Sequence, residues 1–74
     1  MKYWSSVYND DGWILYLRAF TKKAAMSVEV DFGRPGQLRE ISIEDYFRAR
    51  MKHRNTFGGN PFKNAVILPP ELRI

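Results

Sequence analysis

The 74-residue sequence contains no cysteine and a single histidine, His53. Without cysteine there is no disulfide, and a zinc site built on thiolates is excluded. One histidine does not form a metal cluster, and His53 lies in a basic run where a helix end favours a protonated imidazole. We therefore expect no metal and no cofactor, and a fold held together by its apolar core.

The sequence also lacks a long apolar run and the known short catalytic motifs. No stretch approaches the roughly 18 apolar residues that span a membrane, and the first six residues lack the apolar segment of a signal peptide. No G-x-S-x-G, P-loop or dinucleotide-binding pattern is present. These absences predict a cytoplasmic protein without a membrane partner that is not an enzyme.

What is present is positive charge and aromatic bulk. The net charge is +4, the isoelectric point is about 9.7, and two Trp, four Tyr and five Phe supply large side chains. The length predicts one domain over residues 1–74, whose core rarely contributes more than about 3–5 kcal/mol of net stability. The basic balance favours an acidic partner, either nucleic acid or an acidic protein surface, although charge of this kind also serves solubility.

The first twenty residues predict two paired strands. Lys2–Tyr8 is rich in β-forming residues, and Asn9–Gly12 has the composition of a tight turn. Trp13–Phe20 is apolar at both odd and even positions, which is typical of a strand covered on both faces. We expect the second strand to lie in the middle of a sheet.

The next segment, Ala25–Phe32, alternates between apolar and polar residues throughout. Because side chains on a strand change faces at every residue, this pattern predicts a half-buried strand. Glu29 and Asp31 would then both point into solvent. A helix over Thr21–Phe32, capped by Thr21 and Gly33, is the alternative; its β-branched valines and the period of two weigh against it.

The second half predicts one helix. A turn at residues 33–36 and a short strand over Leu38–Ile41 precede Ser42, whose side chain is suited to cap a helix. The apolar residues that follow recur at helical spacing, so we expect a helix near residues 43–54 that ends at Asn55 and a loop over residues 56–60. Ala65–Leu68 is either a fifth strand or a tail laid over the core.

Together these segments predict an α+β fold: a four- to five-stranded, mainly antiparallel β-meander packed against one helix in the C-terminal half. The expected core comprises Leu15, Leu17, Met26, Val28, Val30, Phe32, Ile41, Ile43, Phe47, Met51 and Ile67.

Candidate binding residues come from two basic groups and the sheet aromatics. The first basic group is Arg18, Lys22 and Lys23, and the second is Arg48 and Lys52, which point outward on the helix. Such cations either solvate the surface or bind phosphates. A single helix covers one face of a sheet, so Trp4 or Tyr16 would be exposed as a platform for stacking bases or as a protein-binding hot spot. Alternatively, residues 65–68 cover that face, or a homodimer closes it.

In size, aromatic density and absence of catalytic groups, the sequence resembles small phage and mobile-element proteins, including anti-CRISPR inhibitors. This resemblance involves no motif and carries over no functional residue. It implies an inhibitor or accessory factor that binds a host protein or a protein–nucleic acid complex in the host cytoplasm. A nucleic-acid-binding protein that uses the aromatics and the Arg and Lys residues is the alternative. A RelE-like metal-independent ribonuclease toxin ranks third, because those toxins place helices before the sheet.

Overall fold

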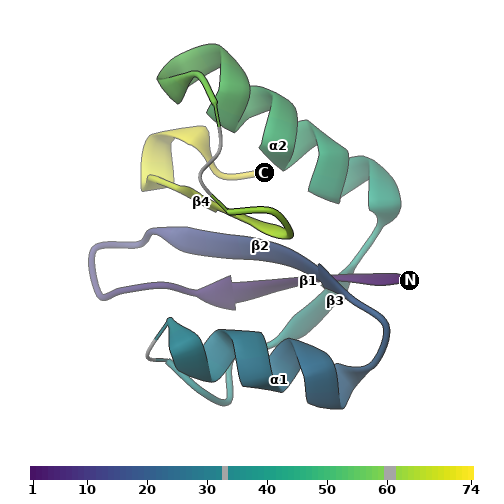
Figure 1. The fold of residues 1–74 in the computed structure, drawn as a ribbon. Helices are drawn as coiled ribbons and strands as arrows, with labels where there is room; N and C mark the ends of the chain where they lie inside the picture. Colours follow the sequence, from purple (N-terminus) through teal and green to yellow (C-terminus); the bar gives the residue numbers. More distant parts are fainter. Residues whose placement is uncertain (33, 60–61) are drawn as a thin grey trace.

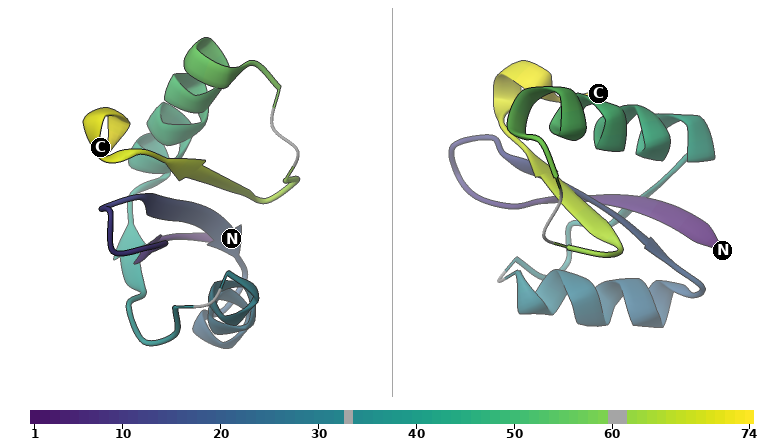
Figure 2. Two further views of the ribbon diagram at one scale, coloured as in Figure 1. Left: turned by 90° about the vertical axis from the view of Figure 1, so that its left-hand side faces the viewer. Right: turned by 45° about the horizontal axis from the view of Figure 1, so that its top comes forward.

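The computed structural model describes residues 1–32, 34–59 and 62–74, and its centre is a four-stranded sheet. The strands are β1 (Lys2–Val7), β2 (Ile14–Ala19), β3 (Arg39–Ile41) and β4 (Ala65–Leu68); the helices are α1 (Lys22–Asp31), α2 (Ile43–Phe57) and the short 3-10 helix η1 (Pro70–Leu72). The strand order is β3-β1-β2-β4, and every neighbouring pair is antiparallel. Helix α1 covers one face of the sheet and α2 covers the other, which gives three layers (Figures 1 and 2).

The α+β class, the antiparallel sheet and the first hairpin are confirmed. The Asn9 side-chain oxygen accepts hydrogen bonds from the main-chain N–H groups of Asp11 (3.0 Å) and Trp13 (3.3 Å). Gly12 follows with φ 89°, a conformation that glycine adopts without a steric cost. The turn therefore sets the register in which Ser5 lies opposite Tyr16, and β2 occupies the predicted central position.

The strand predicted over residues 25–32 is wrong, because this segment belongs to helix α1. Thr21 caps the helix: its hydroxyl accepts a hydrogen bond from the Ala24 N–H at 3.1 Å. The inward face consists of Ala25, Val28, Glu29 and Phe32, which follow the helical spacing i, i+3, i+4 and i+7. The apolar and polar residues of this segment alternate along the sequence, but its buried and exposed residues do not.

Glu29 accounts for this error. Its side chain was expected in solvent but is 1% exposed. The carboxylate accepts hydrogen bonds from the Ser6 hydroxyl on β1 and, at 2.9 Å each, from the main-chain N–H groups of Gly36 and Gln37. A charged residue on the inward face concealed the helical period, because polarity alone assigns it to the surface.

The second helix also changes the topology. Helix α1 connects β2 to β3, which lies on the far side of β1, so the sheet is not a pure meander. Residues 65–68 form its other edge strand, β4, which confirms the strand interpretation of that segment. Gly33 and Asn60, which were expected in turns or loops, lie outside the described residues.

The layers enclose two cores, one on each face of the sheet. Leu15 and Leu17 are confirmed as core residues. The buried residues on the α1 face are Trp4, Leu15, Leu17, Ala19, Ala25 and Ala65. Those on the α2 face are Tyr16, Tyr46, Ala49, Val66 and Leu68. Val28, Phe32, Ile41 and Ile67 are partly buried against these clusters rather than at their centres.

Helix α2 starts at the predicted cap and buries a different face from the predicted one. The Ser42 hydroxyl accepts a hydrogen bond from the Asp45 N–H at 3.1 Å. The helix continues beyond the expected end at Asn55 and stops before Gly58, whose φ of 83° breaks it. Tyr46 and Ala49 are fully buried, since the small alanine lets the helix lie close to the sheet.

Five apolar residues expected in the core are exposed instead. They are Met26 and Val30 on α1, and Ile43, Phe47 and Met51 on α2. On α2 the expected stripe lies to one side of the buried face, because consecutive residues differ by about 100° around a helix. In the described part of the chain, no helix is long and apolar enough to cross a membrane.

Candidate functional site

The two aromatic residues predicted to bind a partner are buried on opposite faces of the sheet. Trp4 and Tyr16 are each 4% exposed, with Trp4 in the cluster beneath α1 and Tyr16 in the cluster beneath α2. The expectation of an exposed aromatic sheet face is wrong, because it assumed one covering helix and the fold has two.

The five predicted cations do not form one surface. Lys22 and Lys23 begin α1, whereas Arg48 and Lys52 lie on α2, across the sheet. Arg18 donates a hydrogen bond from Nε to the Asn64 side chain at 3.0 Å. Arg48 is engaged with Asp45, where the nitrogen–oxygen distance is 3.0 Å, and Lys52 is half-buried. Binding by any of these residues stays a prediction.

One surface of α2 combines exposed apolar side chains with arginines; we call Ile43, Phe47, Arg50, Met51 and Arg54 the α2 flank. Ile43, Phe47 and Met51 are 46%, 48% and 61% exposed and succeed one another at four-residue steps. A groove of about 490 Å³ lies beside the part of the flank that starts at Phe47, and it is bounded by Phe47, Arg50, Met51, Arg54, Gly58, Gly59 and Val66. The helical spacing of Ile43, Phe47 and Met51 is visible in the sequence, but that spacing predicts these three residues in the core.

The arginines of the flank differ in how they are held. Arg50 donates to the Tyr46 hydroxyl at 3.1 Å and to the Lys63 carbonyl at 3.4 Å, and its guanidinium lies over the Tyr46 ring. The Arg54 guanidinium is exposed and has no hydrogen-bond or ion-pair partner among the residues that the structure describes. The groove therefore carries one anchored and one available positive charge.

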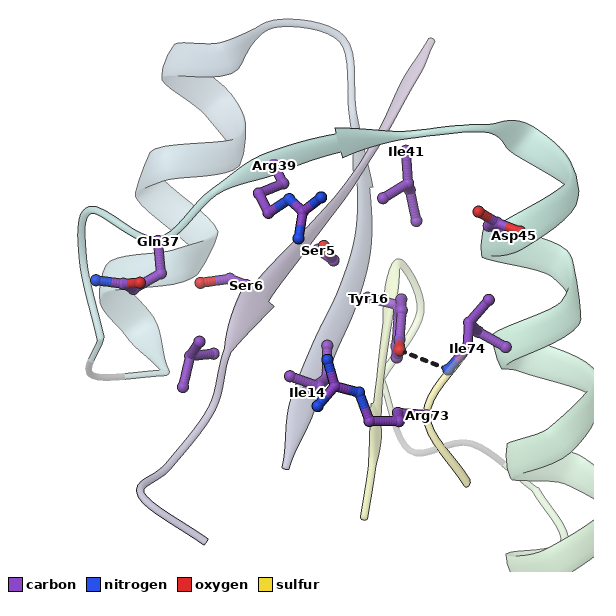
Figure 3. A pocket seen from close by; sticks show the side chains of 11 residues that line it. Ser5, Ser6, Ile14, Tyr16, Gln37, Arg39, Ile41, Asp45, Arg73 and Ile74 are labelled. Carbon is purple, nitrogen blue, oxygen red and sulfur yellow. Dashed lines mark hydrogen bonds between the residues drawn. The ribbon is translucent and has the colours of Figure 1, made fainter. Parts of the chain in front are cut away.

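A second hollow, which we call the arginine cleft, lies on the same face of the sheet, bordered by β3 and the C-terminal segment (Figure 3). Its volume is about 250 Å³, and it is lined by Ser5, Ser6, Val7, Ile14, Tyr16, Gln37, Arg39, Ile41, Asp45, Arg73 and Ile74. Arg39 and Arg73 were not among the predicted site residues. Ser5 and Tyr16 share one face because the register of the first hairpin places them opposite each other.

His53 is half-buried against Phe57, with ring centroids 5.1 Å apart. Within residues 1–32, 34–59 and 62–74, no group of three or more His, Cys, Asp or Glu residues could hold a metal ion.

Comparison of this chain with protein-family models, curated proteins and solved structures finds no match.

Proposed function

We propose that this protein is a non-catalytic binding protein, and that its α2 flank contacts an acidic, amphipathic helical segment of a partner protein. The observation that carries the proposal is the exposed row of Ile43, Phe47 and Met51. Single apolar residues on a surface are ordinary, but a contiguous patch bordered by polar groups is typical of an interaction site.

The spacing of the row favours a helical partner. Residues four apart on a helix form a continuous ridge, and such ridges pack into the grooves of a second helix. Recognition of this kind uses apolar anchors at helical spacing on both partners. Phe47 and the two arginines are residue types well suited to central contacts.

The charge around the row favours an acidic partner. Arg50 and Arg54 line the groove, and none of its described lining residues is acidic. The acidic residues of the first turn of α2 are Glu44 and Asp45, and Asp45 is paired with Arg48. A second copy of this chain would bring arginine against arginine, so we favour a different protein over a homodimer.

The proposal extends to the type of system involved. Occupation of a partner surface without turnover is the mode of action implied by the resemblance to small phage and mobile-element inhibitors. We therefore propose a host protein, or a host protein–nucleic acid complex, as the natural target. Direct nucleic-acid binding has less support, since the aromatic residues that it would use for stacking are buried.

The test uses a synthetic helical peptide with Leu at four-residue spacing and Glu on either side, and a scrambled peptide of the same composition. We expect the protein to bind the amphipathic peptide in fluorescence anisotropy. Met51→Glu should weaken binding about tenfold or more, because it places a negative charge within the contact. Met26→Glu is the matched control, since it adds the same charge at an exposed methionine of α1.

Three outcomes would contradict the proposal. The first is equal binding of the scrambled peptide, and the second is an equal loss in the Met51 and Met26 variants, which would reveal a general charge effect. The third is tighter binding of a single-stranded oligonucleotide that displaces the peptide, which would favour the nucleic-acid alternative. Unchanged melting temperatures of both variants establish that folding is intact.

A further inference from the structure

The arginine cleft contains a row of hydrogen-bond donors that crosses three neighbouring strands. Ser5 on β1 lies opposite Arg39 on β3 and opposite Tyr16 on β2. Side chains directly opposite one another on the same face have Cβ atoms about 4.5–5.5 Å apart. The guanidinium, the hydroxyl and the phenol are therefore close enough to reach one small ligand.

Among the described residues, the hydrogen-bond donors of this row are not all paired with an acceptor. The Tyr16 hydroxyl accepts a hydrogen bond from the Ile74 N–H at 3.0 Å, so its own proton is directed elsewhere. Within the described residues, that proton has no acceptor, although the tyrosine is 4% exposed. A tyrosine hydroxyl both accepts and donates, so the Tyr16 hydroxyl can still donate a hydrogen bond to a ligand that accepts one.

Arg73 adds a second positive charge from the opposite wall. In Figure 3 the Arg39 and Arg73 side chains lie on either side of the hollow, near Ser5 and Ile14 respectively. Neither guanidinium has an ion-pair partner among the residues described. Asp45 is the one acidic side chain among the described lining residues, and it is paired with Arg48 at 3.0 Å.

We propose that the arginine cleft binds a single oxyanion, the carboxylate or phosphate group of a small molecule or of a partner. Guanidinium groups bind both anions through paired, charge-assisted hydrogen bonds. Sites for drug-sized ligands range from about 300 to 1,000 Å³. The volume of the cleft, about 250 Å³, is below that range and therefore suits a single carboxylate or phosphate group. This site is separate from the α2 flank and does not depend on the function proposed for it.

The experiment is an NMR titration of the ¹⁵N-labelled protein with inorganic phosphate and, separately, with acetate, at an ionic strength held constant with chloride. We expect saturable shifts of the Ser5, Tyr16 and Arg39 amides. Arg39→Gln and Arg73→Gln should each weaken binding about tenfold, since each removes a charged donor pair. Tyr16→Phe should weaken it less, about three- to tenfold, and retains the ring that packs in the core.

Lys63→Gln is the control, because it removes one exposed positive charge outside the cleft, and it should leave the titration unchanged. Saturation with phosphate but not acetate identifies a phosphate site, and the reverse identifies a carboxylate site. Linear shifts without saturation for both anions would overturn the proposal. Equal weakening by Lys63→Gln and Arg39→Gln would overturn it too, because binding would then follow net charge.

Discussion

Glu29→Gln tests whether the buried carboxylate holds the fold together. The side chain keeps its size but loses its charge, and one of its two oxygens becomes an NH₂ group. In the wild-type protein both oxygens face donors: Oε1 accepts from Gly36, and Oε2 accepts from Ser6 and Gln37. The amide therefore places a donor against a donor at one of these contacts.

The expected loss follows from these contacts. A hydrogen bond to a charged group contributes about 1.5–3 kcal/mol, so the variant should lose at least that much of its free energy of unfolding. This loss is large for a domain whose core supplies about 3–5 kcal/mol. The helix dipole alone predicts the opposite sign, because removing a negative charge near the end of α1 should stabilise it by about 0.3–1 kcal/mol.

The sign of the change in the free energy of unfolding therefore shows whether the tertiary hydrogen bonds of Glu29 or its position near the end of α1 dominates. Urea unfolding followed by tryptophan fluorescence gives the free energy, and Asp31→Asn on the exposed side of α1 provides the control. We expect the Asp31 variant to be unchanged or slightly stabilised. The Gly36 and Gln37 amides should exchange hydrogen faster in the Glu29 variant. A Glu29 variant at least as stable as wild type would refute the role assigned to the carboxylate.

Two further predictions concern α2. Gly58→Ala should destabilise the protein by about 1–3 kcal/mol in urea unfolding, because φ 83° and ψ −139° place the residue in a region that L-residues rarely adopt. Steric contact does not contribute, since a Cβ would meet no atom within 4 Å. Gly59→Ala should change the stability little, because a Cβ there is equally unobstructed and φ is not in the left-handed region. An equal loss of stability at both positions would refute the conformational explanation. Ala49→Leu should lower the free energy of unfolding by about 1–3 kcal/mol through overpacking between helix and sheet, and unchanged stability would contradict the close approach of α2.

The sequence was sufficient to predict those parts of the fold that depend on residues close together in the chain. The turn at Asn9–Gly12 depends on groups within five residues of one another, and so does the cap at Ser42. The central position of β2 was also visible, because a strand that is apolar on both faces needs cover on both sides. These features predicted the antiparallel sheet and the start of the long helix.

Tertiary structure alone decided the rest. Glu29 belongs to the buried face of α1 because its hydrogen bonds come from Ser6, 23 residues away on β1, and from Gln37, beyond the end of the helix. The same applies to the α2 flank: burial of Tyr46 and Ala49 against the sheet determines which side of the helix remains exposed.

The sequence by itself determined the class of fold, the first hairpin and the residues that can start a helix, since these depend on neighbours along the chain. The three-dimensional arrangement decided that residues 22–31 form a helix and which apolar stripe of α2 faces solvent. It also brings Ser5, Tyr16, Arg39 and Arg73 together in one cleft. The reason is that burial and convergence depend on segments far apart in the sequence, which local periodicity does not record.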